Sequence, residues 1–393
     1  MFKQTYRHNI ALLWASEFLS FFGITSFWLL FLSQHGMTLW QIGVLESIFH
    51  GTSLLSEVPS GILADRFSYK TNLYVSRLAS ILSALLMLVA SGNFWVYALG
   101  MVVSAWAYNF DSGTSSAMLF ESAKEAGLEN KYLRISSFMS GVSEATRTLG
   151  TVLSGFFVHG LLDVTYVIQI VFAILAMVLI WFMKEPSIKV SRDKNPSLTV
   201  IIETVRETFK SNPNLLKWLL TSQIICVLMC MFYFYYQNEL TALTSWQISL
   251  VMLCSSGINI GAVFLASRIG EKCQSVVIFP FIVGLTGLLY LVAILKAPAV
   301  YVVIYLLTDG LYALFLPIFT NDLQHNIPSD VRATLLSVNS MFFSLSMIII
   351  FPLTGFVIDY LGFSKTFLWL GLLLLVLVPV LLKEYRYLPQ KEI

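Results

Sequence analysis

Long runs of apolar residues, separated by short polar stretches, follow one another from one end of the chain to the other. A helix of about 20 apolar residues is long enough to cross the roughly 30 Å hydrocarbon core of a membrane. The pattern therefore predicts twelve transmembrane helices. Their expected ranges are 10–33, 42–63, 71–91, 94–118, 136–158, 163–183, 215–238, 247–267, 275–295, 299–321, 333–357 and 364–382.

Composition and charge placement support a multi-pass membrane protein. Hydrophobic residues make up 57% of the 393 residues and charged residues 12%, against about 45–50% and about 25% in soluble proteins. Arg77 and Arg147 lie inside predicted helices, and only Lys296 and Lys365 fall on the loops of one side. Every other Lys and Arg falls on the opposite side. Because positively charged loops remain in the cytoplasm, both termini are expected there.

The longest polar stretch divides the chain into two halves that resemble each other. We expect a six-helix bundle over 1–185, a cytoplasmic amphipathic linker over 186–213 and a second six-helix bundle over 214–393. Several short patterns recur about 200 residues further along: Trp40-Gln41-Ile42 as Trp246-Gln247-Ile248, Arg66…Lys70 as Arg268…Lys272, Arg134 as Arg332 and Gly155 as Gly355. Because each half holds an even number of helices, these repeats predict two parallel, pseudo-symmetric bundles.

A polar turn between the second and third predicted helices carries the most informative motif, Gly61-Ile-Leu-Ala-Asp65-Arg66-Phe-Ser-Tyr-Lys70. It resembles the loop signature of the major facilitator superfamily, Gly-x-x-x-Asp-Arg-x-Gly-Arg-Lys, with Ser68 and Tyr69 as departures. The resemblance implies that family's all-helical fold and its alternating-access transport, with substrate held between the two halves.

The resemblance also implies a conformational latch. Asp65 would face the N-terminus of the eleventh helix near Arg332, where unpaired N–H groups and the helix dipole attract a carboxylate. Gly61, Arg66 and Lys70 complete the expected latch, and the two basic residues would orient the acid. The alternative is that these residues only anchor the loop on the cytoplasmic side.

Ionisable residues inside the predicted helices are the candidates for handling substrate or protons, because charge within a membrane is costly. They are Glu17, Asp111, Glu144, Arg147 and Asp309. Glu17 has an alternative role as a buried, hydrogen-bonded acid. Glu144 and Arg147 are three residues apart and can pair, either permanently or only during part of a transport cycle. Drug/proton antiporters often carry an arginine where this chain has Asn109, so that subclass is a weaker match.

Two aromatic residues, Tyr233 and Tyr236, belong to the run Phe232-Tyr-Phe-Tyr-Tyr236 near the end of the seventh predicted helix. They are candidates for lining the substrate cavity. An aromatic belt at the membrane surface is an equal alternative, because Tyr and Trp are enriched there.

The leading functional hypothesis is a secondary transporter for a small molecule, with proton-coupled efflux of amphipathic compounds favoured over uptake of a metabolite. The sequence lacks a nucleotide-binding P-loop and the usual hydrolase motifs, so an enzyme is not expected. A receptor or lipid scramblase on the same fold is a distant alternative. We expect no cofactor, metal or nucleic acid, and a monomer in a bacterial inner membrane with protons and lipid as its other partners.

Overall fold

The described part of the chain folds almost entirely into helices, which confirms the predicted all-helical architecture. The computed structural model describes residues 5–64, 67–187, 206, 210, 213–326 and 332–384. Its helices group into two compact units. One unit covers Met1–Ser191 together with Thr244–Met252, and the other covers Arg192–Leu243 together with Leu253–Ile393.

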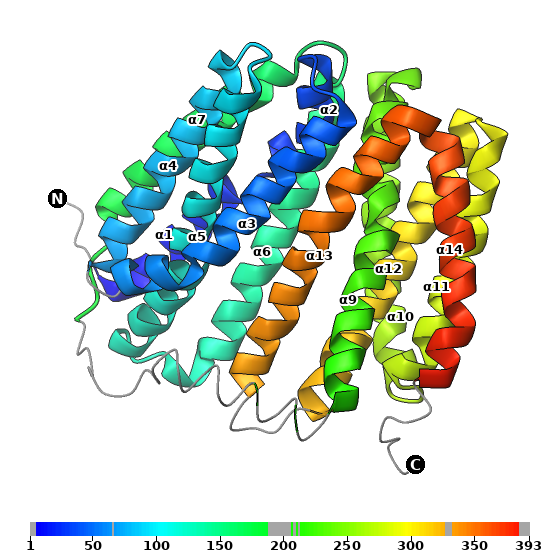
Figure 1. Cartoon of the computed structure of the whole chain (residues 1–393). Helices are drawn as coiled ribbons and strands as arrows, with labels where there is room; N and C mark the ends of the chain where they lie inside the picture. The colour runs from blue at the N-terminus through cyan, green and yellow to red at the C-terminus, as the bar shows by residue number, and fades with distance from the viewer. Residues whose placement is uncertain are drawn as a thin grey trace. The chain divides into compact units, whose positions relative to one another are not determined.

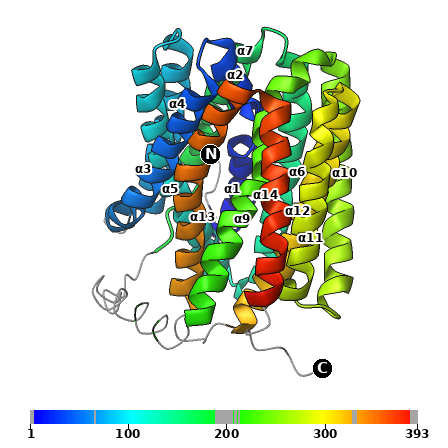
Figure 2. The same ribbon diagram turned by 45° about the vertical axis from the view of Figure 1, so that its right-hand side comes forward.

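The first unit is a bundle in which α4, α5 and α7 run side by side (Figures 1 and 2). α1 packs against α5, α6 and α7, and α3 packs against α5. The helices of this unit are α1 (Tyr6–Ser20), α2 (Trp28–Gln34), α3 (Leu39–Ala64), α4 (Tyr69–Val89), α5 (Phe94–Glu125), α6 (Tyr132–Ser154) and α7 (Leu162–Phe182).

The first predicted transmembrane segment is broken into two helices. α1 and α2 meet at an angle of 42°, and the short 3₁₀ turn Gly23–Thr25 lies between them. Ser26 lies directly after this turn, where its hydroxyl donates to the carbonyl oxygen of Gly23 at 2.6 Å. Such local hydrogen bonds satisfy backbone groups that a break would otherwise leave exposed to lipid. The apolar run continues across the break, so the sequence pattern did not predict it.

Two glycines allow α6 to approach this break closely. A Cβ atom on Gly150 would lie 2.3 Å from the backbone nitrogen of Gly23, and a Cβ on Gly23 would lie 2.5 Å from the carbonyl oxygen of Arg147. No side chain fits at either position without moving a backbone. Gly150 therefore provides the close backbone approach that small residues allow between membrane helices.

The second unit packs around a cluster of aromatic rings. Phe232 lies 5.6 Å from Tyr290 and 4.8 Å from Phe367, measured between ring centroids. The Tyr290 hydroxyl donates to the carbonyl oxygen of Met229 at 2.6 Å, so this buried polar group is satisfied. The elements of this unit are α9 (Pro213–Tyr235), the 3₁₀ helix η4 (Tyr236–Ala242), α11 (Ser275–Val292), α12 (Pro298–Asn326), α13 (Arg332–Leu361) and α14 (Phe363–Glu384). It also contains α10 (Ser245–Gly270) from Leu253 onward, while the first residues of that helix belong to the first unit.

Eight helices in the described part of the chain are long and apolar enough to cross a membrane, and the bent pair α1–α2 makes a ninth. The eight are α4, α7, α9 with η4, α10, α11, α12, α13 and α14. Helices α3, α5 and α6 also coincide with predicted ranges, but they do not meet the same test of length and apolarity. The total of twelve transmembrane helices and the pseudo-symmetry of the halves therefore stay predictions. The predicted linker 186–213 lies almost wholly outside the described residues.

Candidate functional site

A buried ion pair joins α4 to α5 inside the first unit. Arg77 Nη2 lies 2.9 Å from Asp111 Oδ1, and the two side chains are only 6% and 10% exposed. The same carboxylate oxygen accepts a hydrogen bond from Ser115 Oγ at 3.0 Å, one helical turn further along α5. A charged pair held this far from water persists only with such close geometry, because its desolvation is costly.

Glu17 brings a second carboxylate to this pair from α1. Glu17 is 2% exposed and lies close enough to Asp111 and Arg77 to interact electrostatically with both. Three helices thus place two carboxylates around one guanidinium. We call Glu17, Arg77 and Asp111 the buried triad. The structure brings together two residues that the sequence analysis had selected separately.

Arg77 is the member of the triad to which the sequence analysis gave no role. Its presence inside an apolar segment was the available signal, because an arginine within a membrane helix usually has a function or a partner. Its Nε atom is buried without a hydrogen-bond partner among the described residues. Arg77 therefore keeps donor capacity beyond its bond to Asp111.

Asp309 lies at the centre of a second polar cluster, on α12 of the second unit. It accepts hydrogen bonds from Ser255 and from Asn259 Nδ2, the latter at 2.8 Å. These two donors are four residues apart on α10, so one face of that helix presents both. Asp309 follows Asp111 by about 200 residues, the same spacing as the internal repeats. The sequence analysis had not predicted Ser255 or Asn259.

Glu144 and Arg147 form an ion pair on α6, as their spacing allows. Arg147 Nη2 donates to both carboxylate oxygens at 2.8 Å. The two side chains are 65% and 62% exposed, so this pair belongs to an exposed face of α6.

The predicted latch is described only in part. Gly61 lies within α3 and Arg332 begins α13, whereas Asp65 and Arg66 lie outside the described residues. Lys70 begins α4 with Tyr69, and its ammonium donates to the carbonyl oxygens of Trp181 at 3.2 Å and Met183 at 2.8 Å, at the end of α7. A cation at a helix C-terminus is favourable, so Lys70 also joins two helices of its own unit.

The two candidate cavity tyrosines differ in exposure. Tyr236 is 1% exposed, and its ring stacks on Tyr305 at 5.0 Å. Tyr233 is 38% exposed and stacks on the same ring at 5.9 Å. Tyr236 therefore packs in the core of the second unit, while Tyr233 presents part of its ring at a surface. Among the described residues, no group of three His, Cys, Asp or Glu side chains is placed to hold a metal ion.

Sequence comparison relates most of the chain to one family of transporters. A model of the Major Facilitator Superfamily matches residues 13–351. An uncharacterized MFS-type transporter of Bacillus subtilis, YxaM, is 24% identical over 187 residues, which is 47% of this chain and 45% of that relative. The match thus spans less than half of the relative's length.

Solved structures agree with the family match. The crystal structure of nucleoside transporter NupG covers 98% of this chain and 99% of its own, with a TM-score of 0.73 and 15% identity. The xylose transporter XylE from E. coli, in an inward open conformation, gives a TM-score of 0.67 with 11% identity, covering 98% and 96% of the two chains. Identities this low show a shared fold alone. The family match over residues 13–351 establishes that this multi-pass chain belongs to the major facilitator superfamily, whose members are transporters and not enzymes.

Proposed function

We propose that this transporter exports small amphipathic molecules by alternating access and that proton movement drives the export. The observation that supports proton coupling is the buried triad, in which one guanidinium binds Asp111 and a second carboxylate, Glu17, lies near both. With both acids ionised, the triad would carry an uncompensated negative charge in a region that water hardly reaches. One bound proton makes the triad neutral, which is the behaviour that a coupling site needs.

The hydrogen bonds that Asp111 accepts indicate which of the two acids carries that proton. A serine hydroxyl carries one proton, and Ser115 directs it to Asp111. Asp111 also accepts a hydrogen bond from Arg77, and both donors favour the ionised form of Asp111. We therefore assign the proton to Glu17 in the arrangement where Arg77 binds Asp111.

A second arrangement of the triad has the same total charge. If the proton moves to Asp111, that carboxyl group no longer neutralises Arg77, and the guanidinium can bind Glu17 instead. Arg77 would thus exchange one acid for the other as the proton is taken up and released. Arg77 thus has two discrete arrangements, one bound to each acid. An alternating-access cycle can favour one arrangement or the other.

The second unit offers features that suit an amphipathic cargo. Tyr233 presents an aromatic surface, and its ring stacks on Tyr305, one helical turn before Asp309. Aromatic rings and a carboxylate together attract cationic amphiphiles. Export is our choice of direction because the chain resembles compact efflux permeases, and uptake of a small metabolite is the alternative that the test below separates.

Other parts of the proposal come from the sequence. Asp65 and its basic neighbours act as the latch of the cytoplasmic side, both termini lie in the cytoplasm, and one chain forms a complete transporter. A bacterial inner membrane is the proposed location, in agreement with the bacterial relative.

Flux measurements on purified protein in liposomes test this proposal. Fluorescent cationic and neutral amphiphiles are screened under an imposed pH gradient while the internal pH is followed. Movement of a dye against the proton flow is the expected result. Dye flux that leaves the internal pH unchanged would contradict proton coupling. Dye movement in the same direction as the protons would contradict export and support uptake.

A further inference from the structure

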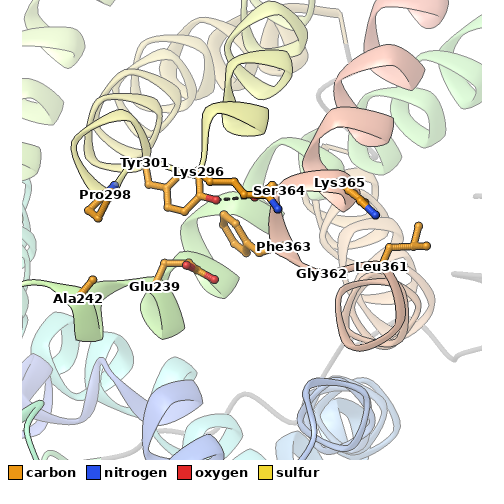
Figure 3. Close-up of a pocket in the computed structure, with 10 residues that line it drawn as sticks. All are labelled: Glu239, Ala242, Lys296, Pro298, Tyr301, Leu361, Gly362, Phe363, Ser364 and Lys365. Carbon is orange, nitrogen blue, oxygen red and sulfur yellow. Dashed lines mark hydrogen bonds between the residues drawn. The ribbon is translucent and has the colours of Figure 1, made fainter.

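The second unit contains a cavity of about 420 Å³ at one end of its helices. Its walls come from the end of η4, the segment that leads into α12, and the turn between α13 and α14 (Figure 3). The Tyr301 hydroxyl and the Ser364 hydroxyl are 2.6 Å apart and fix α12 to the start of α14 on one wall. This cavity is formed within one unit and shares no residue with the buried triad or the Asp309 cluster.

Charges of both signs line this cavity. Glu239 lies half-buried on η4, while Lys296 and Lys365 are exposed on the other two segments. In Figure 3, Glu239 and Lys296 extend from different walls with the ring of Phe363 between them. Among the described residues, neither lysine forms an ion pair with Glu239. The three charges therefore surround open space instead of neutralising one another.

The start of α14 adds donors to the positive side of the cavity. Gly362, with φ of +83°, turns the chain directly before this 22-residue helix. The N–H groups of the first helical turn, which include those of Phe363 and Ser364, lack partners within the helix. The helix dipole places partial positive charge at this end. The two lysines and these N–H groups together favour an oxyanion.

We propose that this cavity binds a small zwitterion, with the ligand's ammonium at Glu239 and its oxyanion at Lys365, Lys296 and the start of α14. A ligand with both charges is favoured over a simple anion, because an anion alone would leave the half-buried Glu239 carboxylate without a cation. A simple cation would meet two lysines. The ligand chemistry is shared by free amino acids and by the phosphoethanolamine headgroup of a lipid.

Binding of matched probes to the full chain in phosphatidylglycerol nanodiscs tests the site. γ-Aminobutyrate carries both charges, whereas butyrate and butylamine each carry one of them on a chain of the same length. Isothermal titration should show binding of γ-aminobutyrate at least about tenfold tighter than either single-charge probe, because a charge-assisted hydrogen bond contributes at least this factor. Equal binding of butyrate and γ-aminobutyrate would overturn the proposal.

Substitutions of the charged residues that line the cavity test whether γ-aminobutyrate binds there. Glu239→Gln and Lys365→Gln should each weaken γ-aminobutyrate binding about tenfold, since each removes one charge–charge contact. Lys383→Gln is the matched control, because Lys383 is an exposed lysine at the opposite end of α14. Circular dichroism of each variant confirms that it is folded. A Glu239→Gln variant that is folded and binds γ-aminobutyrate normally would contradict the proposal.

Lipid competition distinguishes the two sources of the zwitterion. Nanodiscs that contain phosphatidylethanolamine should weaken binding of free γ-aminobutyrate if a headgroup occupies the cavity. Unchanged binding identifies a free solute as the occupant. Either result supports the same site, provided that Glu239→Gln weakens γ-aminobutyrate binding about tenfold in phosphatidylglycerol nanodiscs.

Discussion

Arg77 is the side chain on which the charge balance of the first unit depends. It binds Asp111 at 2.9 Å and interacts electrostatically with Glu17, so it lies near two acids that come from different helices. Removing it leaves buried carboxylates without a cation, which costs more than losing an exposed ion pair. The burial of the Arg77 guanidinium, more than the length of its bond to Asp111, determines how much its removal costs.

Replacing Arg77 by Met should therefore destabilise the folded protein by about 3–5 kcal/mol, the usual cost of breaking a buried ion pair. The double variant Arg77→Met, Asp111→Asn should recover much of that loss, because it removes the stranded charge as well. Thermal unfolding in detergent measures both. Equal instability of the single and double variants would show that the side chain of Arg77 matters for packing and not for charge.

The exposed pair Glu144–Arg147 provides the comparison at the same scale. Its two hydrogen bonds are as short as that of the buried pair, but its side chains are more than 60% exposed. Exposed pairs contribute about 0–1 kcal/mol. Bond geometry alone therefore does not predict which of the two pairs contributes more to stability, whereas burial does.

At the scale of elements, glycine contacts position the helices of each unit. Gly150 on α6 meets Gly23 in the break after α1, and Gly287 on α11 meets Gly371 on α14 in the same manner. A Cβ on Gly371 would lie 2.7 Å from the carbonyl oxygen of Gly287. In both units, backbones touch where two helices cross, which is the usual way that membrane helices pack closely.

Gly150→Ala should destabilise the protein by about 1–3 kcal/mol, because the added methyl group has no room and a backbone must shift. Gly141→Ala on the same helix is the matched control, since nothing lies within 4 Å of a Cβ at that position. The control should be neutral or slightly stabilising, because alanine favours helix. Unfolding temperatures of the two variants check the difference, and equal values would refute the close contact.

A carboxylate cap also connects two elements of the first unit. Glu185, which follows α7, accepts hydrogen bonds from the backbone nitrogens of Tyr69 at 2.7 Å and Lys70 at 3.0 Å. Glu185→Ala should lower stability by about 0.5–2 kcal/mol, the cost of losing a helix cap. Glu129→Ala, which removes an exposed acid, is the control. A Glu185 variant as stable as the Glu129 variant would exclude the cap as a stabilising contact.

The sequence predicted where helices form much better than how they pair. Apolar runs reveal helices because a chain within lipid must satisfy its backbone hydrogen bonds internally. The pairing of Glu144 with Arg147 was also predictable, since both residues lie on one helix. The contact between Arg77 and Asp111 was not, because it depends on the rotation of α4 against α5. The break at Gly23 escaped prediction because small residues such as Gly23, Thr25 and Ser26 also occur within unbroken membrane helices.

At the scale of the whole molecule, the central question is how charge in one unit controls a transport cycle. The polar latch predicted from the sequence and the buried triad have different tasks in our account. The latch biases which conformation is populated, whereas the triad binds and releases the proton. These tasks predict different kinetic effects, so variants can separate them.

Asp65→Asn should slow transport while leaving substrate affinity nearly unchanged, because the latch acts on the conformational change and not on the bound molecule. Initial rates at a series of substrate concentrations give the maximal rate and the apparent affinity separately. A large loss of affinity with a normal maximal rate would contradict this role and place Asp65 in substrate binding.

The most direct test of our account measures proton movement by the Glu17→Gln variant in liposomes. Wild-type protein should couple dye export to proton entry. Glu17→Gln should lose that coupling but still exchange dye for dye, because the amide cannot release a proton. Asp163→Asn, which removes a half-exposed acid on α7, should behave like the wild type. Dye export by Glu17→Gln that remains fully driven by the pH gradient would contradict the buried triad as the coupling site.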